Sequence, residues 1–434
     1  MHRRIVEALL LVFLAVIGVN WPELPYGARV ADLLFVPLGV AVVTLTGLRW
    51  TWRQPDLAIA LYLLAALPAI AVSADRSHSA MELVREIYLA AVYVIVAIVA
   101  REGFARAVGN GLALGGAVLS IAGLIFVALQ MRGGAPATPL MGEFMQLPYL
   151  GETLRLRAMT ASEAMFACLL TAAVPFAIAM CTADRIRIWC AVSAAMIFAA
   201  AFTFSHALAG FTVAVVIAAW PLLRARRYLR RLAVTAAVLV VLALNFAATV
   251  SIRSIIDEGE GYTDRSQYHY GVDQGDFRID EVIVTYSVMS YARIKQVAWQ
   301  AFIEHPIAGM GLGRFHTATI RAYENGALTA DYREIDPHSE VFGRLAETGL
   351  IGGVTLLLLW VAWAVMAREV TVSGSVLAYA AAAALAGLVV SSLNADIMNF
   401  RFVWVLAGLL RGLQDASGMV IVAGRGASDA AGTR

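Results

Sequence analysis

The segment Asp336-Pro337-His338-Ser339 stands directly before a long apolar stretch and carries residue types suited to acid–base chemistry. Asp336 fits an N-cap and Pro337 a first helical position, which places His338 in the first turn of the following helix. There the free backbone N–H groups and the positive helix end would attract a phosphate and disfavour imidazolium. A neutral imidazole at this position predicts a general base for a hydroxyl group. An interfacial histidine without a chemical role is the alternative that these residues leave open.

Charged residues continue into the same apolar stretch. Glu340 and Arg344 are four residues apart, and Arg344 and Glu347 are three apart, so all three can pair along one helical face. Charge inside a membrane is costly and typically lines a cavity, although an internally neutralised structural pair is an equal alternative. The glycines within 349–353 predict close approach of a neighbouring helix.

Arginine supplies nearly all the positive charge, because Lys295 is the only lysine in the chain. Guanidinium groups bind phosphate oxygens in pairs and do not lose their charge. Arg155 and Arg157 precede one apolar stretch and Arg293 lies in a long polar connection, all on the side where arginine is not required for membrane orientation. They are candidate phosphate ligands. Solvated loop charges, paired with nearby acids, are the alternative.

Ser205 and His206 occupy a predicted turn between two apolar stretches, where they can face the same pocket as the histidine before residue 339. Neighbouring side chains diverge on a helix, and no acid is placed to orient the imidazole, so this pair does not predict a hydrolytic triad. Further acids lie within apolar stretches and are candidates either for a site or for pairing with an arginine: Asp32, Glu163 and Asp396.

A metal site is not expected. Such a site needs His, Cys or carboxylate side chains that converge at a recognisable spacing. The first external connection offers only Glu23 before Asp32. We therefore expect chemistry without a metal or another cofactor, with arginines supplying the positive charge.

The elements that must position these residues are transmembrane helices. The chain has 434 residues, of which 60% are hydrophobic and 15% charged, and this is too apolar for a soluble domain. We predict an all-α polytopic membrane protein with about twelve spans of roughly 20 residues. The net charge of +2, with basic residues scattered at span ends, does not predict nucleic-acid binding. The predicted spans are 5–20, 29–47, 56–73, 86–100, 107–129, 158–181, 188–204, 207–223, 232–250, 339–366, 375–393 and 396–413.

Arginine placement predicts the orientation of these spans, because short cytoplasmic connections carry the positive excess. The arginine-rich connections all fall on one side: Arg3 and Arg4, Arg49 and Arg53, Arg101 and Arg106, Arg185 and Arg187, and the run 224–231. Both termini are thus predicted to be cytoplasmic. The candidate catalytic and phosphate-binding residues described above then lie on the opposite, periplasmic face. The intramembrane acids are the exception.

Four regions follow from this pattern. Residues 1–250 hold helices 1–9, residues 251–338 form a large periplasmic loop between helices 9 and 10, residues 339–413 hold helices 10–12, and residues 414–434 form a cytoplasmic tail. The front half of the loop is too polar to span a membrane, and loops this long typically carry function. Its back half has apolar residues at helical spacing, which predicts an amphipathic helix against the membrane face.

The stretch 293–353 resembles the signature region of the O-antigen ligase and polymerase family. One part is a helix with Arg293 and Trp299 that runs into the sequence HPIAGMGLGRF of residues 305–315. The other part lies at the start of a late span and comprises His338, Ser339, Glu347, Gly349 and Gly352. Outside this stretch the resemblance covers only the arrangement of many spans and one large external loop.

The resemblance implies an integral-membrane glycosyltransferase that uses an undecaprenyl pyrophosphate-linked glycan as donor, without metal or nucleotide sugar. It implies that His338 activates the acceptor hydroxyl. Arg293, together with Arg155 or Arg157, is implied to hold the pyrophosphate. Supporting roles near the catalytic histidine fall to Ser339, Arg344 and Glu347.

Two positions depart from the family pattern. His206 stands where the family commonly has arginine, and Glu163 stands where it commonly has asparagine. A protonated His206 would still be a pyrophosphate ligand, whereas a neutral one would contribute no charge.

The implied partners are the lipid-linked donor, a glycan or lipid-glycan acceptor, membrane lipids and other polysaccharide-assembly proteins. The implied process is O-antigen, lipopolysaccharide or exopolysaccharide biosynthesis in the bacterial inner membrane, with ligase and polymerase types both open. A transporter or flippase of a lipid-linked glycan or other anion is the alternative, and it would place its charges near the membrane midplane on broken helices. A non-catalytic scaffold of an assembly complex is a third reading.

Overall fold

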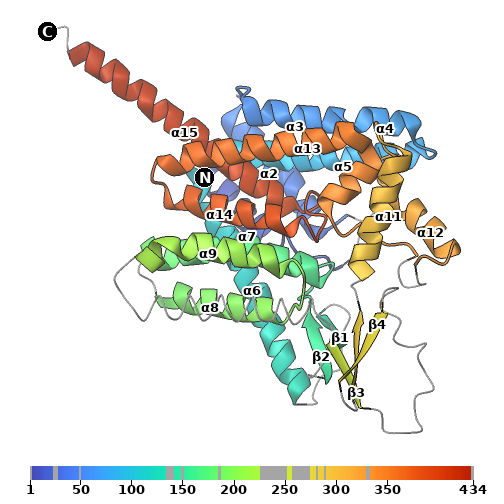
Figure 1. The fold of residues 1–434 in the computed structure, drawn as a ribbon. Helices are drawn as coiled ribbons and strands as arrows, with labels where there is room; N and C mark the ends of the chain where they lie inside the picture. Colours follow the sequence, from blue (N-terminus) through green and yellow to red (C-terminus); the bar gives the residue numbers. More distant parts are fainter. Residues whose placement is uncertain are drawn as a thin grey trace.

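The protein is described by a computed structural model as a bundle of long helices with two small sheets at one end (Figure 1). The structure describes residues 2–22, 28–47, 50–132, 141–147, 151–183, 187–224, 252–256, 274–279, 282–287, 290–328 and 333–431. In Figure 1 the strands and the helices α11 and α12 lie together at the right-hand end of the bundle, and the chain start and the tip of α15 lie toward the left. The predicted periplasmic connections thus share one end of the molecule.

The first half of the bundle follows the predicted spans closely. It contains α1 (His2–Ala15), α2 (Val30–Thr46), α3 (Gln54–Leu64), α4 (Ala66–Val72), α5 (Arg76–Val99) and α6 (Ala105–Met131). A π-helical turn, η2 (Ala100–Phe104), joins α5 to α6 without an open connection, and Gly103 within it takes a positive φ of 93°.

The second half contains α7 (Glu163–Ala183), α8 (Arg187–Ala201), α9 (Leu208–Arg224), α13 (Glu340–Val372), α14 (Val376–Ser391) and α15 (Arg401–Ala431). The predicted span 232–250 lies outside the described residues. The helix α15 continues beyond 413 through the segment predicted as a cytoplasmic tail. Cys181 and Cys190, on α7 and α8, are joined by a disulfide bond that the sequence did not predict.

Apolar helices dominate the part of the chain that the structure describes. By length and composition, four helices there can cross a membrane: Gln54–Val72, the continuous Arg76–Met131, Glu163–Cys181 and Glu340–Val372. The shorter apolar helices are Val30–Thr46, Ile188–Ala201, Leu208–Pro221 and Val376–Ser391. Large apolar side chains such as Leu350 and Leu357 are exposed along α13, as expected for a surface that faces lipid. These features support the predicted helical membrane protein, while the count of twelve spans stays a prediction.

Two antiparallel sheets lie in the long connections, where the sequence analysis expected no strands. A hairpin of β1 (Gly142–Leu147) and β2 (Gly151–Leu156) precedes α7, and Leu147 pairs with Gly151 at its turn. The second sheet has the order β3 (Ile252–Ile256), β5 (Val282–Ser287), β4 (Gln274–Ile279). Strands of five or six residues carry too little periodicity to stand out between apolar helices.

The predicted amphipathic helix is present as α11 (Ser290–Glu304), and a second short helix, α12 (Phe315–Glu324), follows it. On α11 the buried face consists of Ile294, Ala298 and Ala301, which pack with Phe315 and Ala346. This small cluster fixes α11 against the start of α13 and is separate from the main core.

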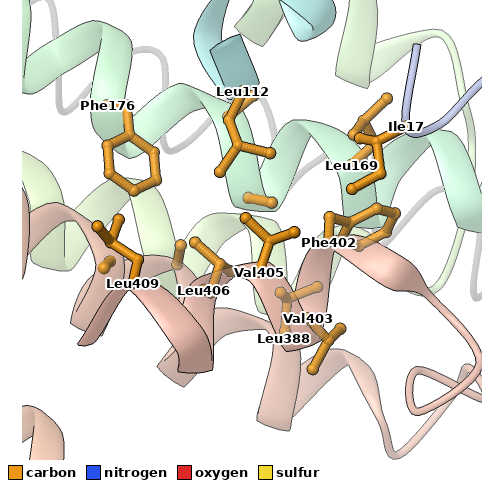
Figure 2. Packing of buried hydrophobic residues seen from close by; sticks show 14 of the residues in the cluster. Ile17, Leu112, Leu169, Phe176, Leu388, Phe402, Val403, Val405, Leu406 and Leu409 are labelled. Atoms are coloured by element: carbon orange, nitrogen blue, oxygen red, sulfur yellow. The ribbon is translucent and has the colours of Figure 1, made fainter. Parts of the chain in front are cut away.

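The main core surrounds α15, which packs against α5, α7 and α14. Figure 2 shows Phe402 and Leu406 of α15 facing Leu169 and Phe176 of α7, with Leu112 of α6 beside them. The small residues of α14, mostly alanine, allow that helix to lie close to its neighbours.

Ion pairs, one partly buried and one fully buried, connect the C-terminal helices to the N-terminal ones. Arg401 binds Asp32 through two hydrogen bonds of 2.6 and 2.5 Å, so Asp32 is an arginine partner. Ten residues further along α15, Arg411 is fully buried and contacts Asp56 at 3.2 Å. Such pairs orient the helices, because breaking one leaves an uncompensated buried charge.

Candidate functional site

His338 lies just before α13 rather than in its first turn. The helix begins at Glu340 with Ser339 in the N-cap position, so the expectation that Asp336 caps the helix is wrong. The backbone N–H of Glu340 bonds to the carbonyl oxygens of Ser392 and Ala395 at 2.9 and 3.2 Å. This tertiary contact selects the helix start. His338 itself takes a left-handed φ of 47°, a conformation that non-glycine residues adopt uncommonly.

The connection between α14 and α15 covers the start of α13. Ser339 Oγ donates to the carbonyl of Ser392 at 3.3 Å, and Glu340 Oε2 accepts the N–H of Met398 at 3.0 Å. The first N–H of α13 is therefore already bonded to backbone carbonyls, and the carboxylate of Glu340 lies at that end of the helix. Positive charge for a phosphate must come largely from side chains.

The imidazole of His338 is partly buried and neutral near neutral pH. Its pKa is lowered to about 4, mainly by burial; Asp396 opposes this change and Lys295 adds to it. A general base must be unprotonated before it can accept a proton, so this protonation state fits the predicted role. Asp396 thus lies near the site. This was one of the two roles considered for it, the other being pairing with an arginine.

His206 is in the same electrostatic environment. Burial lowers its pKa to about 4, and the nearby Arg155, Lys295 and His338 contribute in the same direction. Because both histidines respond to Lys295, and His206 also responds to His338, the structure brings the α8–α9 connection and the start of α13 together. His206 is uncharged near neutral pH and offers hydrogen bonds rather than the positive charge of a protonated ligand.

The two arginines before α7 have different surroundings. Arg155 Nε donates to the carbonyl of Thr203 at 3.4 Å, and Arg155 Nη2 lies 3.8 Å from Glu163 Oε2. Arg157 instead donates to the carbonyls of Thr160 and Ala161, within its own turn. Of the two alternatives, Arg155 is the one directed to the connection that carries His206.

The two cations on α11 also contact different partners. Arg293 donates to Gln296 on the same helix at 3.1 Å. Lys295 reaches the α14–α15 connection, where its Nζ donates to Asn394 Oδ1 at 2.7 Å. Residues two apart on a helix point in nearly opposite directions, which explains the difference. Sequence reasoning missed Lys295 as a site residue, although its being the only lysine was a signal.

Arg344 lies in a buried ionic cluster near the start of α13. It contacts Glu340 at 3.7 Å, which confirms the predicted pairing, but its closest partner is Glu86 of α5 at 2.6 Å. Tyr62 donates to the same Glu86 carboxylate at 3.2 Å and stacks beneath the guanidinium. The cluster supports the reading of a neutralised structural group, and Glu86, 258 residues away in the chain, gave no sequence signal.

Glu347 does not form the ion pair predicted with Arg344. Its Oε1 accepts the N–H of Phe315 at 3.0 Å and so caps the start of α12. The carboxylate thereby fastens the loop that carries residues 305–315 to α13.

A pair of glycines makes this docking possible. Gly349 interrupts α13 with a φ of 63°, and Gly309 in the loop takes a φ of 71°. A methyl group on Gly349 would overlap the carbonyl of Ile307, and one on Gly309 would overlap the backbone of Glu347. The glycines therefore admit a loop backbone, where the sequence had predicted a neighbouring helix. The two parts of the signature region form one packed unit.

The same loop also contacts the start of α5, which the sequence analysis had not singled out. Ser79 Oγ donates to the carbonyl of Leu312 at 2.8 Å, and His78 Nε2 lies 3.2 Å from the carbonyl of Gly313.

In the described part of the chain, no group of three or more His, Cys, Asp or Glu side chains is arranged to hold a metal ion.

Comparison with known proteins gives one finding. Residues 191–357 match the model of the O-antigen ligase family. The matched range includes α8, α9, α11, α12 and the first half of α13, and it contains His206, Arg293 and His338, while Arg155 precedes it. No curated protein matches the chain.

Proposed function

Taking the O-antigen ligase family assignment of this membrane protein as the premise, we propose that it transfers a glycan from undecaprenyl pyrophosphate to a sugar hydroxyl. The observation that carries the proposal is the neutral imidazole of His338, which lies at the end of the bundle near Lys295 and His206. A neutral base beside positive side chains suits a reaction that takes up a proton and releases an anion.

In the proposed reaction, the acceptor hydroxyl gives its proton to His338 and its oxygen attacks the anomeric carbon of the donor. The bond between that carbon and the phosphate oxygen breaks, and its electron pair leaves with undecaprenyl pyrophosphate. One displacement of this kind inverts the configuration at the anomeric carbon. Arg155 and Arg293 are the guanidinium groups proposed to stabilise the leaving pyrophosphate.

The pKa of His338 fits this sequence of events. A base with a pKa near 4 is neutral but weak, because the most effective general base has a pKa near the working pH. An anionic pyrophosphate close to the imidazole favours the protonated form and raises its pKa. Donor binding would therefore strengthen the base at the moment when it is needed.

The proposed setting is the periplasmic face of the bacterial inner membrane, in O-antigen, lipopolysaccharide or exopolysaccharide biosynthesis. Ligase and polymerase share the chemistry described above and differ in the acceptor. We favour a polymerase, and product length separates the two in the assay below.

The break in α13 at Gly349 favours a transporter, because transporters bind their substrates at broken helices. Here the break is filled by the backbone of the 305–315 loop: the N–H of Leu350 bonds to the carbonyl of Pro306 at 2.8 Å. The buried Arg344 nearby is already paired with two carboxylates of the chain, Glu86 and Glu340, so it is not a vacant binding charge. The enzyme therefore has the stronger support.

The test is glycan transfer in proteoliposomes that contain the purified protein, a lipid-linked donor and an acceptor. Replacing His338 by Ala should lower the rate by about 10²- to 10⁴-fold, the usual contribution of a general base. Arg155→Gln should lower it strongly, whereas Arg157→Gln, a matched control in the same turn, should have the smaller effect. Transfer that persists in the His338 variant would refute the base assignment. Donor movement across the bilayer without transfer would indicate a flippase.

A further inference from the structure

We propose that Lys295 is a diphosphate-binding residue of the transfer site and that Asn394 positions its ammonium group. This inference rests on the proposed function and adds a residue to it. It also implies that the strength of the base depends on whether the donor is bound.

The position of Lys295 is fixed by its helix. Ile294 and Ala298, on either side of it in the sequence, are 0% and 1% exposed and pack against Phe315 and Ala346. Because α11 is held in this way, the backbone of Lys295 has a defined place relative to α13. The four-carbon stem then carries the ammonium to the α14–α15 connection.

The partner of the ammonium is a neutral oxygen. Lys295 Nζ donates to Asn394 Oδ1 at 2.7 Å, and this uses one of its three N–H donors. Among the described residues, no carboxylate lies within 4.0 Å of this nitrogen. Arg155, by contrast, has Glu163 beside it. A half-buried cation whose charge is not balanced by a carboxylate is costly, and an anionic ligand would offset that cost.

Asn394 is itself held close to the catalytic segment. The flanking residues Ser392 and Ala395 accept the N–H of Glu340, two residues after His338. The amide of Asn394 therefore sets the ammonium at a fixed place relative to the imidazole. Positioning by a neutral amide leaves the charge of Lys295 available to a ligand.

The charges that face His338 come from three segments. Lys295 of α11 favours the neutral imidazole, Asp396 of the α14–α15 connection favours the protonated one, and His206 of the α8–α9 connection is itself neutral near pH 7. Bound diphosphate would cancel the effect of Lys295 and leave that of Asp396. This shift favours proton uptake by His338.

The diphosphate of the lipid carrier is the ligand class that fits best. It is the group whose charge increases as the bond to the sugar breaks, so a cation there acts most strongly in the transition state. The first N–H of α13 is already bonded to carbonyls of the α14–α15 connection, so an ammonium from α11 supplies positive charge that this N–H does not.

The experiment compares Lys295→Met, Lys295→Arg and Asn394→Asp with wild type in the reconstituted transfer assay. Arg321→Met serves as the matched control, because Arg321 is an exposed cation on α12 that pairs with Glu304. Loss of one charged hydrogen bond to phosphate predicts that Lys295→Met lowers kcat/KM for the donor by about 10- to 100-fold. Lys295→Arg should recover part of the activity, and Arg321→Met should match wild type.

Two readouts separate this role from a structural one. In Lys295→Met the acid limb of the kcat/KM pH profile should move to higher pH, because the free enzyme no longer has the cation that favours neutral His338. In Asn394→Asp the new carboxylate should compete with phosphate and raise KM for the donor while the protein melts no lower than wild type. Unchanged kcat/KM and pH profile in Lys295→Met, with His338→Ala inactive, would overturn this inference and leave the proposed function standing. An inactive wild type would overturn both.

Discussion

The N–H of Phe315 donates to the carboxylate of Glu347 at 3.0 Å, which joins the start of α12 to α13 just before the break at Gly349. Glu347 belongs to the signature region, yet its contact is structural. Residues of a shared motif can thus hold a site together without touching the reacting groups.

Glu347→Ala should therefore destabilise the protein by about 1–2 kcal/mol, the usual cost of losing a helix cap. Glu347→Gln should keep most of the stability, because its amide oxygen can accept the same N–H bond. Thermal unfolding in detergent measures both, and limited proteolysis within 305–328 reports loosening of the loop. Equal melting temperatures for wild type and Glu347→Ala would contradict the capping role.

Gly349→Ala should destabilise the protein by more than the strain of an alanine at positive φ alone. The reason is that the added methyl group would overlap the carbonyl of Ile307. The matched control is Gly326→Ala: Gly326 also has a positive φ, of 73°, but it has no atom within 4 Å of the added group. The control should lose about 1–2 kcal/mol from backbone strain alone. Similar melting temperatures for the two variants would show that the close approach at Gly349 is unimportant.

Arg344 and Glu86 should behave as a coupled pair. Arg344→Met should destabilise the protein by about 3–5 kcal/mol, since it leaves the buried carboxylates of Glu86 and Glu340 without their cation. Glu86→Leu alone should cost less, because Arg344 keeps Glu340 as a partner. The double variant should lose much less than the sum, and the melting temperatures of the four proteins give the coupling energy. Tyr62→Phe, which removes one hydrogen bond to Glu86, should cost only about 1 kcal/mol. Additive losses would show that the pair is not coupled.

Stability should fall as the pH is lowered from about 6.5 toward 4. The pKa of His206 and of His338 is near 6.5 in the unfolded chain and about 4 in the folded protein. Between these pH values the unfolded state binds more protons than the folded state, so lowering the pH favours unfolding. Above pH 6.5 the two histidines no longer lower the stability. Melting temperatures of wild type and of a His206→Gln, His338→Gln variant across this range provide the test. An equally steep decline in the variant would refute the assignment.

The helices were predictable because each is encoded locally. Apolar runs predicted α13 at 339–366 and α14 at 375–393, and the helices are found at Glu340–Val372 and Val376–Ser391. The hairpin of β1 and β2 was not predicted, because its strands are short and lie between apolar helices. The cap of α13 was wrongly assigned to Asp336, because the carbonyls that bond its first N–H come from a distant connection.

The sequence by itself determined that this chain is a helical membrane protein, that His338 and the glycine-rich loop belong to one signature, and that Arg344 pairs with Glu340. The membrane helices and the Arg344–Glu340 pair follow from hydrophobic period, residue type and separations within a turn of helix, whereas the shared signature follows from the resemblance to a known family. Tertiary structure alone decided that Glu86 is the main partner of Arg344, that Glu347 caps α12 and that Lys295 reaches Asn394 beside the histidines. Those contacts join segments up to 258 residues apart, and only the packing of the helices sets such distances.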